Sequence, residues 1–569
     1  MAPVPLQVAG RNRTAHHGLL SGHGRELLHG EAPRVSEPRE DRRIVDGETG
    51  DRNRDAEDGC RPDGQGIFLY PSDSHVGTPV HENSPERKTE GMPPRLFGAD
   101  DSQGFAMHEH AILLKNIFCL MTETDKPTLS GADMLITGKT IARIDPTGSI
   151  EAPKGARVID CSSHVVLPGF VNTHHHFYQT LTRNHPAVQN AELFDWLRFL
   201  YNVWKHIDDE GVYTSSLLAM GELLKTGCTC TTDHHYLYPR GFSGDLMGIQ
   251  FAAADKLGMR FSPTRGSMSL SRKDGGLPPD SVVQTADEIL QDSERVINRY
   301  HDPSPMAMHK IVLAPCSPFS VTKDLMRESA RLARAHGVRL HTHLAETRDE
   351  NDFCIGMYGK RPVALMEECE LIGPDVFYAH GIHFNDEELR ILRDTGSHIA
   401  HCPSSNMRLG SGICRVREML AMGINVGIAV DGSASNDASD MLGEIRNALL
   451  LQRVEQGADA LTARQAFAMA SENGARMLNF SQVGRLVEGW AADAAIFNVH
   501  ALPYAGSLSD PVAALLFCGN DHTTDYTIVN GQVVVDGRRL VGVDESELVR
   551  KANAISKDML AKAERKEEV

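Results

Sequence analysis

The pattern of apolar and polar residues divides the chain of 569 residues into a long central region and two flanks. From about residue 165 to 435, short apolar and β-branched runs alternate with longer stretches of helical periodicity that end at glycine. Eight such units predict an α/β fold, a (β/α)₈ barrel of the TIM type. The eight predicted strands lie within residues 164–176, 228–236, 259–268, 311–320, 339–346, 376–384, 398–406 and 425–437.

The flanks of the barrel region have a different pattern. Residues 133–146 alternate apolar and polar positions around a turn, which is typical of a β-hairpin, and residues 484–500 and 525–540 also predict short strands with glycine turns. We therefore expect a small β-sandwich built from both flanks. Residues 1–105 are charged and lack apolar periodicity, which predicts a disordered extension. The predicted parts are the extension (1–105), the sandwich (106–167 and 479–543), the barrel (168–478) and a C-terminal helix (544–569).

Composition and charge narrow the classes of function. The net charge of -18 argues against nucleic acid as a main partner. No apolar run approaches the roughly 18 residues that a membrane span requires, so no membrane partner is expected. The 11 cysteines include no CxxC pair, which favours a reducing, cytoplasmic compartment over a disulfide framework.

Three consecutive histidines, His174, His175 and His176, follow the first predicted strand. Neighbouring side chains on a strand point to opposite faces, so His174 and His176 can share a face that His175 cannot join. Two imidazoles on one face could bind a metal ion, or could form a polar strand end without further function. This short stretch supports both interpretations equally.

Other predicted strands also end in residues that can bind metals or move protons. His343 and Glu346 follow one another closely, His380 ends the sixth strand, and Asp431 ends the eighth. Taken singly, each could instead have a purely structural role: His343 as a core histidine, Glu346 as the start of a helix, and Asp431 as a turn former. Because the C-terminal ends of barrel strands meet on one face, the combination favours a metal site with an open position for water. The donors suit Zn²⁺, with Fe²⁺ as second choice.

Five motifs, "PGFVNTHHH", "HTHLAE", "AHGIH", "HCPSSN" and "VDGSASND", resemble in their order the amidohydrolase superfamily, in particular its hydrolytic deaminases. The resemblance covers residues 107 to 540. It implies that one metal ion per chain is bound by His174, His176, His343 and Asp431. It further implies that Glu346 and His380 handle protons, together with Asp431 as a catalytic residue. Residues 311–320 contain no lysine to bridge two metals, so the resemblance implies one ion.

Further stretches, including "HHHFYQTLTR", "LFDWLRFLY" and "DHHYLYPRG", resemble those family members that deaminate 8-oxoguanine to uric acid and ammonia. The expected substrate is accordingly a small oxopurine-like ring. The alternatives are a hydroxytriazine, isocytosine or pterin ring, or a catalytically silent barrel that acts as a binding scaffold. Gln179, His234 and Arg265 are candidates for binding the ring, with structural support as an equal alternative for each. A homo-oligomer is also expected.

Overall fold

The computed structural model describes residues 111–240, 242 and 244–565. The predicted disordered extension over residues 1–105 lies outside the described residues. So do the last four residues of the predicted C-terminal helix.

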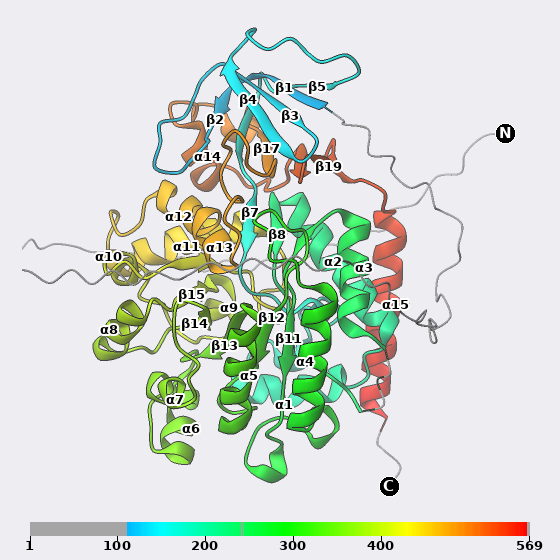
Figure 1. Ribbon diagram of the computed structural model, residues 1–569, viewed down its shortest axis with the longest axis vertical. Coiled ribbons are helices and arrows are strands. Elements are labelled where there is room, and N and C mark those ends of the chain that lie inside the picture. The colour runs from blue at the N-terminus through cyan, green and yellow to red at the C-terminus, as the bar shows by residue number, and fades with distance from the viewer. Residues whose placement is uncertain (1–110, 241, 243, 566–569) are drawn as a thin grey trace, which may run out of the picture. The chain divides into compact units, whose positions relative to one another are not determined.

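A parallel sheet of seven strands forms the centre of the α/β part of the chain (Figure 1). A second parallel sheet, of three strands, stands beside it. The seven strands, in spatial order, are β16 (Val426–Ile428), β15 (His398–His401), β14 (Val376–His380), β13 (Arg339–Leu344), β12 (Val312–Pro315), β11 (Thr264–Ser267) and β9 (His234–His235). The three strands are β10 (Arg260–Phe261), β8 (Cys228–Thr231) and β7 (Phe170–Asn172).

The ten parallel segments occupy the eight predicted strand ranges. Only two residues separate β8 from β9, and two separate β10 from β11, so each pair continues one strand direction. The first predicted range needs a correction, because its residues divide between two sheets. His164–Pro168 forms β6 of another sheet, and the chain enters the parallel sheet only at Phe170. Gly169 lies at this boundary, where a Cβ atom would come within 2.2 Å of Thr229 Oγ1.

Helices lie outside the parallel strands and alternate with them along the chain (Figure 1). Their starts and ends follow ordinary capping rules. Helix α8, for example, begins with a capping box of Asn385 and Glu388 and ends at Gly396, whose φ is 73°. The helices of this part are α1 (Leu193–Trp204), α2 (Asp209–Lys225), α3 (Leu246–Leu257), α4 (Ala286–Tyr300), α5 (Lys323–His336), α6 (Arg348–Tyr358), α7 (Pro362–Glu368), α8 (Asp386–Thr395), α9 (Pro403–Arg408), α10 (Val416–Ala421), α11 (Met441–Gln456), α12 (Ala463–Met469) and α13 (Glu472–Met477).

Two further sheets pack against each other at one end of the α/β part (Figure 1). Strand β6 from the N-terminal flank pairs antiparallel with β17 from the C-terminal flank, so the two flanks share one sheet. Apolar side chains of both sheets, among them Ile112, Met134 and Ile496, form a common core. The strands are, in spatial order, β4 (Thr140–Pro146), β3 (Ala132–Thr137), β1 (Ala111–Ile117) and β5 (Arg157–Asp160), and then β2 (Cys119–Leu120), β6 (His164–Pro168), β17 (Ala494–Asn498), β18 (Tyr526–Val529), β19 (Gln532–Asp536) and β20 (Arg539–Leu540).

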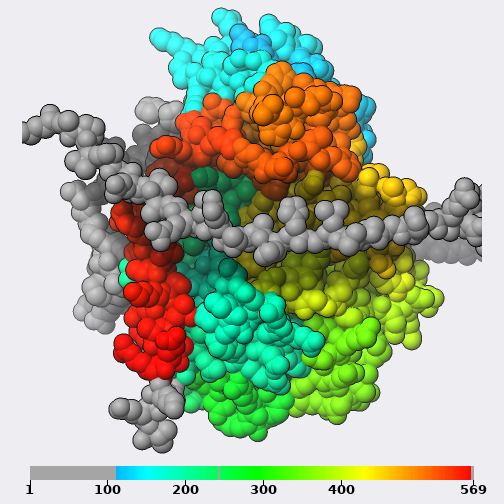
Figure 2. Space-filling model, turned by 180° about the vertical axis from the view of Figure 1, so that it is seen from behind, coloured from blue at the N-terminus to red at the C-terminus, as the bar shows by residue number. Residues whose placement is uncertain are grey.

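The C-terminal helix α15 (Glu545–Glu564) lies along α2 and forms the red ridge in Figure 2. It buries Leu548, Ala552 and Met559, and Lys551 Nζ pairs with Glu210 Oε1 at 2.8 Å. The helix therefore packs on the α/β part instead of standing in solvent. Among helices of the described residues, none combines the length and the apolar content needed to cross a membrane.

Candidate active site

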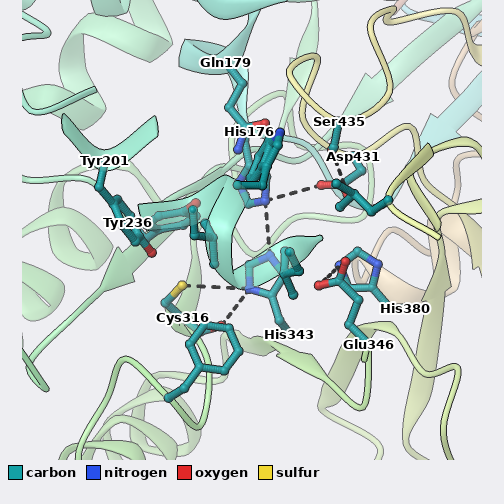
Figure 3. Close-up of a pocket in the computed structure, with 15 residues that line it drawn as sticks. His176, Gln179, Tyr201, Tyr236, Cys316, His343, Glu346, His380, Asp431 and Ser435 are labelled. Atoms are coloured by element: carbon teal, nitrogen blue, oxygen red, sulfur yellow. Dashed lines mark hydrogen bonds and ion pairs between the residues drawn. The ribbon is translucent and has the colours of Figure 1, made fainter. Parts of the chain in front are cut away.

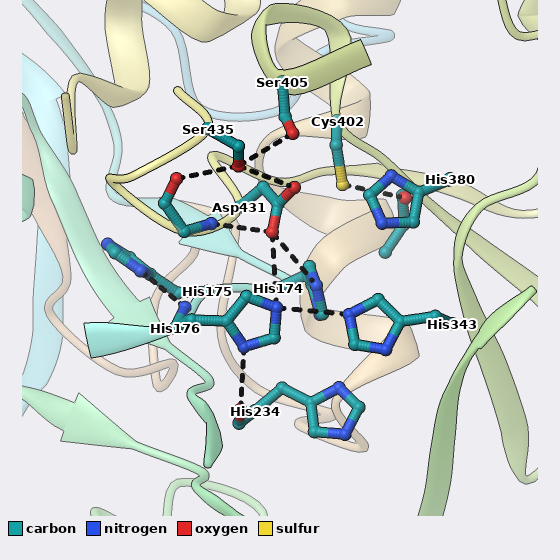
Figure 4. A network of polar contacts seen from close by, with 12 residues as sticks. His174, His175, His176, His234, His343, His380, Cys402, Ser405, Asp431 and Ser435 are labelled. Carbon is teal, nitrogen blue, oxygen red and sulfur yellow. Dashed lines mark hydrogen bonds and ion pairs between the residues drawn. The ribbon is translucent and has the colours of Figure 1, made fainter. Parts of the chain in front are cut away.

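The predicted metal and proton-handling residues lie together where the parallel strands end (Figures 3 and 4). The three consecutive histidines are not themselves on a strand, because β7 ends at Asn172. Hydrogen bonds continue the strand direction, with Thr173 N donating to Ile428 O (3.0 Å) and Asp431 N to His174 O (3.1 Å). His174 and His176 converge as expected, whereas His175 points away and its Nε2 lies 2.9 Å from Ser439 Oγ.

The strand ends hold the backbone in an unusual conformation at three places. Ala345, His380 and Asp431 have φ values of 54°, 74° and 63°, in the left-handed region that residues other than glycine rarely adopt. Such strain persists only where the surroundings hold it in place, and it is concentrated at functional sites. Here it turns the side chains of Glu346, His380 and Asp431 toward a common cavity.

Backbone carbonyls fix the protons on two of the predicted ligands, His176 (Figure 4) and His343 (Figure 3). His176 Nδ1 donates to His234 O at 2.8 Å, and His343 Nδ1 donates to Cys316 O at 2.7 Å. A neutral imidazole carries one proton, so the Nε2 atom of each ring has only its lone pair. These two Nε2 atoms lie 3.1 Å apart and face each other.

The proton on His174 is fixed by His341, a residue that the sequence analysis missed. His341 Nδ1 donates to Phe377 O at 2.8 Å, so its Nε2 can accept the proton on His174 Nδ1, 2.7 Å away. His174 Nε2 is left without a proton and lies 3.3 Å from Asp431 Oδ1. The spacing could have shown this, because His341 and His343 fall on the same face of one strand.

Three imidazole lone pairs and a carboxylate thus meet in a buried space with no proton between them. Burial lowers the pKa of His174 and His343 well below the usual value, so both rings stay neutral. Two lone pairs cannot hydrogen-bond to each other, and a cation between them removes their repulsion. Tetrahedral Zn²⁺ with Zn–N bonds of about 2.0–2.1 Å separates its nitrogen ligands by about 3.3 Å, close to the spacing found here. The donors can therefore hold such a cation.

Asp431 is ionised in this setting. Burial raises its pKa, but the contact with His174 and the nearby His380 and His176 lower it more, and the net pKa is well below the usual value. One oxygen, Oδ1, accepts from Gly432 N at 2.6 Å and faces His174 and His176. The other, Oδ2, has a single long hydrogen-bond contact among the described residues, from Ser435 Oγ at 3.4 Å.

Glu346 and His380 form the opposite side of the cavity (Figure 3). Glu346 Oε2 lies 3.5 Å from His380 Nε2, and within the described residues Glu346 Oε1 makes no hydrogen bond. Burial raises the pKa of Glu346 well above its usual value, and the charges of Asp431 and Glu350 raise it further. These effects favour the protonated form of Glu346, which can donate a proton. Asn406 Nδ2 donates to His380 Nδ1 at 3.0 Å, which leaves the His380 proton on Nε2.

Glu350, also missed from the sequence, holds the turn that presents Glu346. Its Oε1 accepts from Ala345 N at 2.8 Å and its Oε2 from Glu346 N at 3.0 Å. Burial raises the pKa of Glu350 to about 7. The carboxyl group satisfies both backbone donors of a left-handed turn that would otherwise be buried without partners.

The cavity is small, about 30 Å³, and has one polar and one apolar side. This is room for about one water molecule, so the lining must rearrange to admit a ring. Two polar atoms in the lining, Trp196 Nε1 and Gln179 Oε1, are buried without a hydrogen-bond partner among the described residues. The apolar side consists of Leu193, Trp196, Leu197 and Tyr201 from α1, with Phe319 and Leu409.

The three predicted ring-binding residues do not lie together. Gln179 lines the cavity, but His234 and Arg265 do not. His234 lies behind the cavity with its ring stacked on His343 at 4.6 Å. Of the two alternatives for Arg265, its contacts favour structural support, because its guanidinium is already engaged. It donates to Asp292 Oδ2 at 2.7 Å and stacks on Tyr238 at 3.9 Å.

Comparison with known proteins agrees with this geometry. The profile of the amidohydrolase family matches residues 165–534. The chain is 46% identical over 448 residues to 8-oxoguanine deaminase from Pseudomonas aeruginosa, covering 79% of this chain and 99% of the relative. It is 36% identical to isoxanthopterin deaminase from an unknown prokaryotic organism, covering 79% and 97%. The crystal structure of atrazine chlorohydrolase TrzN from Arthrobacter aurescens TC1 complexed with zinc superposes with a TM-score of 0.75 at 30% identity, covering 78% and 100%.

Proposed function

The chain belongs to the amidohydrolase family, and from that premise we propose that it deaminates 8-oxoguanine to uric acid and ammonia. It is a metal-dependent hydrolase that acts on C–N bonds. One observation carries the proposal: a buried glutamic acid, Glu346, whose pKa is raised well above its usual value, faces the same cavity as His176, His343 and Asp431. This combination provides a proton donor for a ring nitrogen beside a place for a nucleophilic water.

The proposed chemistry divides among four groups of side chains. His174, His176, His343 and Asp431 would hold one Zn²⁺, with Fe²⁺ as second choice. When bound, the cation supplies a water whose pKa falls from 15.7 toward roughly 7. Asp431 Oδ2 has capacity to accept the proton of that water. Glu346 gives its proton to the ring nitrogen beside the attacked carbon, and His380 Nε2–H donates to the attacking oxygen. Asp431 then passes the proton it accepted to the amine, which leaves as ammonia, and the hydroxyl formed on the ring returns a proton to Glu346 as it becomes the product carbonyl.

Recognition of the ring is proposed to rest on the cavity's unsatisfied polar atoms. Gln179 Oε1 can accept from a ring N–H, and Trp196 Nε1 can donate to a ring carbonyl. The flat apolar side formed by α1 suits the faces of an aromatic ring. His234 does not line the cavity, but it offers a ring nitrogen within 4.8 Å of the ligand atoms of His174 and His343, so it remains a candidate beside the metal site.

The parallel strands are proposed to close into an eight-stranded (β/α)₈ barrel. Asn172 supports this, because it connects the first strand to both neighbours. Its Oδ1 accepts from Val430 N at 2.9 Å, and its Nδ2 donates to Thr231 Oγ1 at 3.0 Å. The hydrogen bond from Thr173 N to Ile428 O likewise joins the end of β7 to β16. The barrel at 168–478 and the sandwich at 106–167 and 479–543 stay predictions.

The cellular setting is part of the proposal. All ten cysteines in the described ranges are free thiols, and nine of them are buried. This supports the predicted cytoplasmic compartment. The expected homo-oligomer also stays a prediction.

A related ring is the second candidate substrate, because the chain is also 36% identical to isoxanthopterin deaminase and to hydroxydechloroatrazine ethylaminohydrolase. The deciding experiment measures ammonia release from 8-oxoguanine, isoxanthopterin, isocytosine and a hydroxytriazine under identical conditions. We expect the highest kcat/KM with 8-oxoguanine. A higher value with another ring would replace the substrate assignment. Release of ammonia from none of them by metal-loaded protein would support the scaffold alternative.

A further inference from the structure

A second set of metal-binding atoms adjoins the first (Figure 4). His380, Cys402 and Asp431 each offer one ligand atom, and these atoms lie within 4.8 Å of one another. All three side chains are buried. We propose that a second, weaker Zn²⁺ binds here and inhibits the enzyme, an inference that rests on the proposed function for its inhibitory effect.

Asp431 can serve both sites because its two oxygens have different surroundings. Oδ1 faces His174 and His176, while Oδ2 has only the 3.4 Å contact with Ser435. Figure 4 shows Cys402 and His380 on the side of Asp431 away from His176. A bridging carboxylate would place the second cation on that side.

Cys402 is the ligand that distinguishes the second site. Among the described residues, its Sγ has a weak contact with Ala400 O at 3.5 Å and an interaction with the backbone of His380, so coordination displaces no strong side-chain bond. Three buried carboxyl groups, those of Asp431, Glu444 and Glu346, lie close enough to act on its charge. A neutral thiol must release its proton to solvent as the Zn–S bond forms. The second site offers three donors against four in the first, which makes it the weaker site.

His380 can become a ligand without moving its backbone. At present Asn406 Nδ2 donates to His380 Nδ1, and Asn406 Oδ1 makes no hydrogen bond with described residues. A half-turn of the amide lets Oδ1 accept from a proton on Nδ1, which frees the lone pair of Nε2. The second cation would then occupy the imidazole and the carboxylate oxygen that handle protons in the proposed reaction. Binding therefore stops turnover.

The test begins with protein that carries one zinc per chain and adds Zn²⁺ in steps, measuring bound metal and deamination rate. The variants are Cys402→Ala and Cys402→Ser, and the matched control is Cys369→Ala, another buried cysteine outside this donor cluster. We expect a second zinc in the unmodified protein together with loss of activity. In both Cys402 variants the inhibitory concentration should rise at least about 10-fold, with unchanged activity at low zinc.

Cobalt gives a readout that needs no substrate. A thiolate-to-cobalt absorption band should appear with the second Co²⁺ equivalent and be absent from Cys402→Ala. Inhibition of both Cys402 variants at the same Zn²⁺ concentration as the unmodified protein, or binding of no second metal, would overturn the proposal. If no substrate is deaminated while the cobalt band remains, the proposed function fails and the second metal site stands.

Discussion

The candidate active site and a larger cavity beside α2, α11 and α15 are both lined by acidic and basic side chains, but they differ in how these are paired. The larger cavity has a volume of about 450 Å³, and the cavity of the candidate active site has a volume of about 30 Å³. Its basic groups each have a carboxylate: Arg183 pairs with Glu222, Lys225 with Glu545 at 2.6 Å, and His522 with Asp440. In the active site, imidazole lone pairs face one another instead.

The difference shows that the pairing of charged side chains is a better guide to the chemistry of a cavity than its volume. A charge that already has its counter-charge contributes to packing and has little capacity for a ligand. Buried atoms without partners are costly, and they are kept where a ligand satisfies them. The larger cavity therefore lies in the packing interface between the C-terminal helix and the α/β part, whereas the small cavity contains the candidate catalytic residues.

The largest expected contrast comes from removing one histidine from each cavity. His343→Ala takes away one of four metal ligands, so the protein should lose its single bound metal and fall to background activity. His522→Gln is the matched change in the larger cavity and should keep both. Elemental analysis and ammonia release measure the two outcomes. Two metals per chain at low zinc concentration would show that the single-metal assignment is wrong.

Glu346→Gln tests the proton donor without removing a metal ligand. Gln is nearly isosteric but cannot donate a proton usefully, so kcat should fall by roughly 10²–10⁴-fold with a much smaller change in KM. Steady-state kinetics on metal-replete protein measures it. A kcat within a factor of a few of the unmodified enzyme would remove Glu346 from the mechanism.

His341→Gln tests whether the network behind the ligands matters. The change disturbs the proton that His174 gives to His341, so metal affinity should fall by about 10–100-fold while the fold is kept. Competition with a chelator measures the affinity. An affinity equal to that of the unmodified protein would mean that His341 only fills space.

Arg265→Gln tests whether Arg265 stabilises the fold or binds the substrate ring. Because Arg265 bonds to Asp292 and stacks on Tyr238 away from the cavity, unfolding free energy should fall by about 2–3 kcal/mol with KM unchanged. Denaturant unfolding and steady-state kinetics give the two values. A large rise in KM with full stability would restore the original expectation that Arg265 binds the ring.

The smallest effect concerns pH in the larger cavity. The hydrogen bond to Asp440 raises the pKa of His522 above its usual value of about 6.5. The pair therefore stabilises the fold fully below that pH, and the contribution disappears as pH rises through the raised pKa. His522→Gln should lower stability by about 1 kcal/mol or less near pH 5.5 and by nothing near pH 9. Equal destabilisation at both values would contradict this.

The sequence predicted the strands and the gathering of candidate residues at the strand ends for a physical reason. Parallel strands buried on both faces form distinct apolar runs, and their C-terminal ends converge wherever the strands run side by side. His343, His380 and Asp431 could thus be grouped from their positions in the chain alone. The division of 164–176 between two sheets could not be predicted, because Pro168 and Gly169 lie within one continuous apolar run.

The features that the sequence left open or did not reveal have separate physical causes. On a strand that is buried on both sides, composition does not reveal which side chains face inward, and Arg265 faces α4 instead of the cavity. Glu350 was missed because it acts on backbone N–H groups, which leave no mark in a side-chain pattern. The apolar side formed by α1 was visible only as the helical periodicity of a packed helix.

The most direct test of the central claim is the reaction of 8-oxoguanine in water labelled with heavy oxygen. A water-derived nucleophile that replaces the amine should give uric acid with one labelled oxygen and one ammonia per molecule, and chelation of the metal should stop both. Mass spectrometry of the product and an ammonia assay measure the ratio. Uric acid without the label, or no ammonia from the metal-loaded protein, would contradict the account.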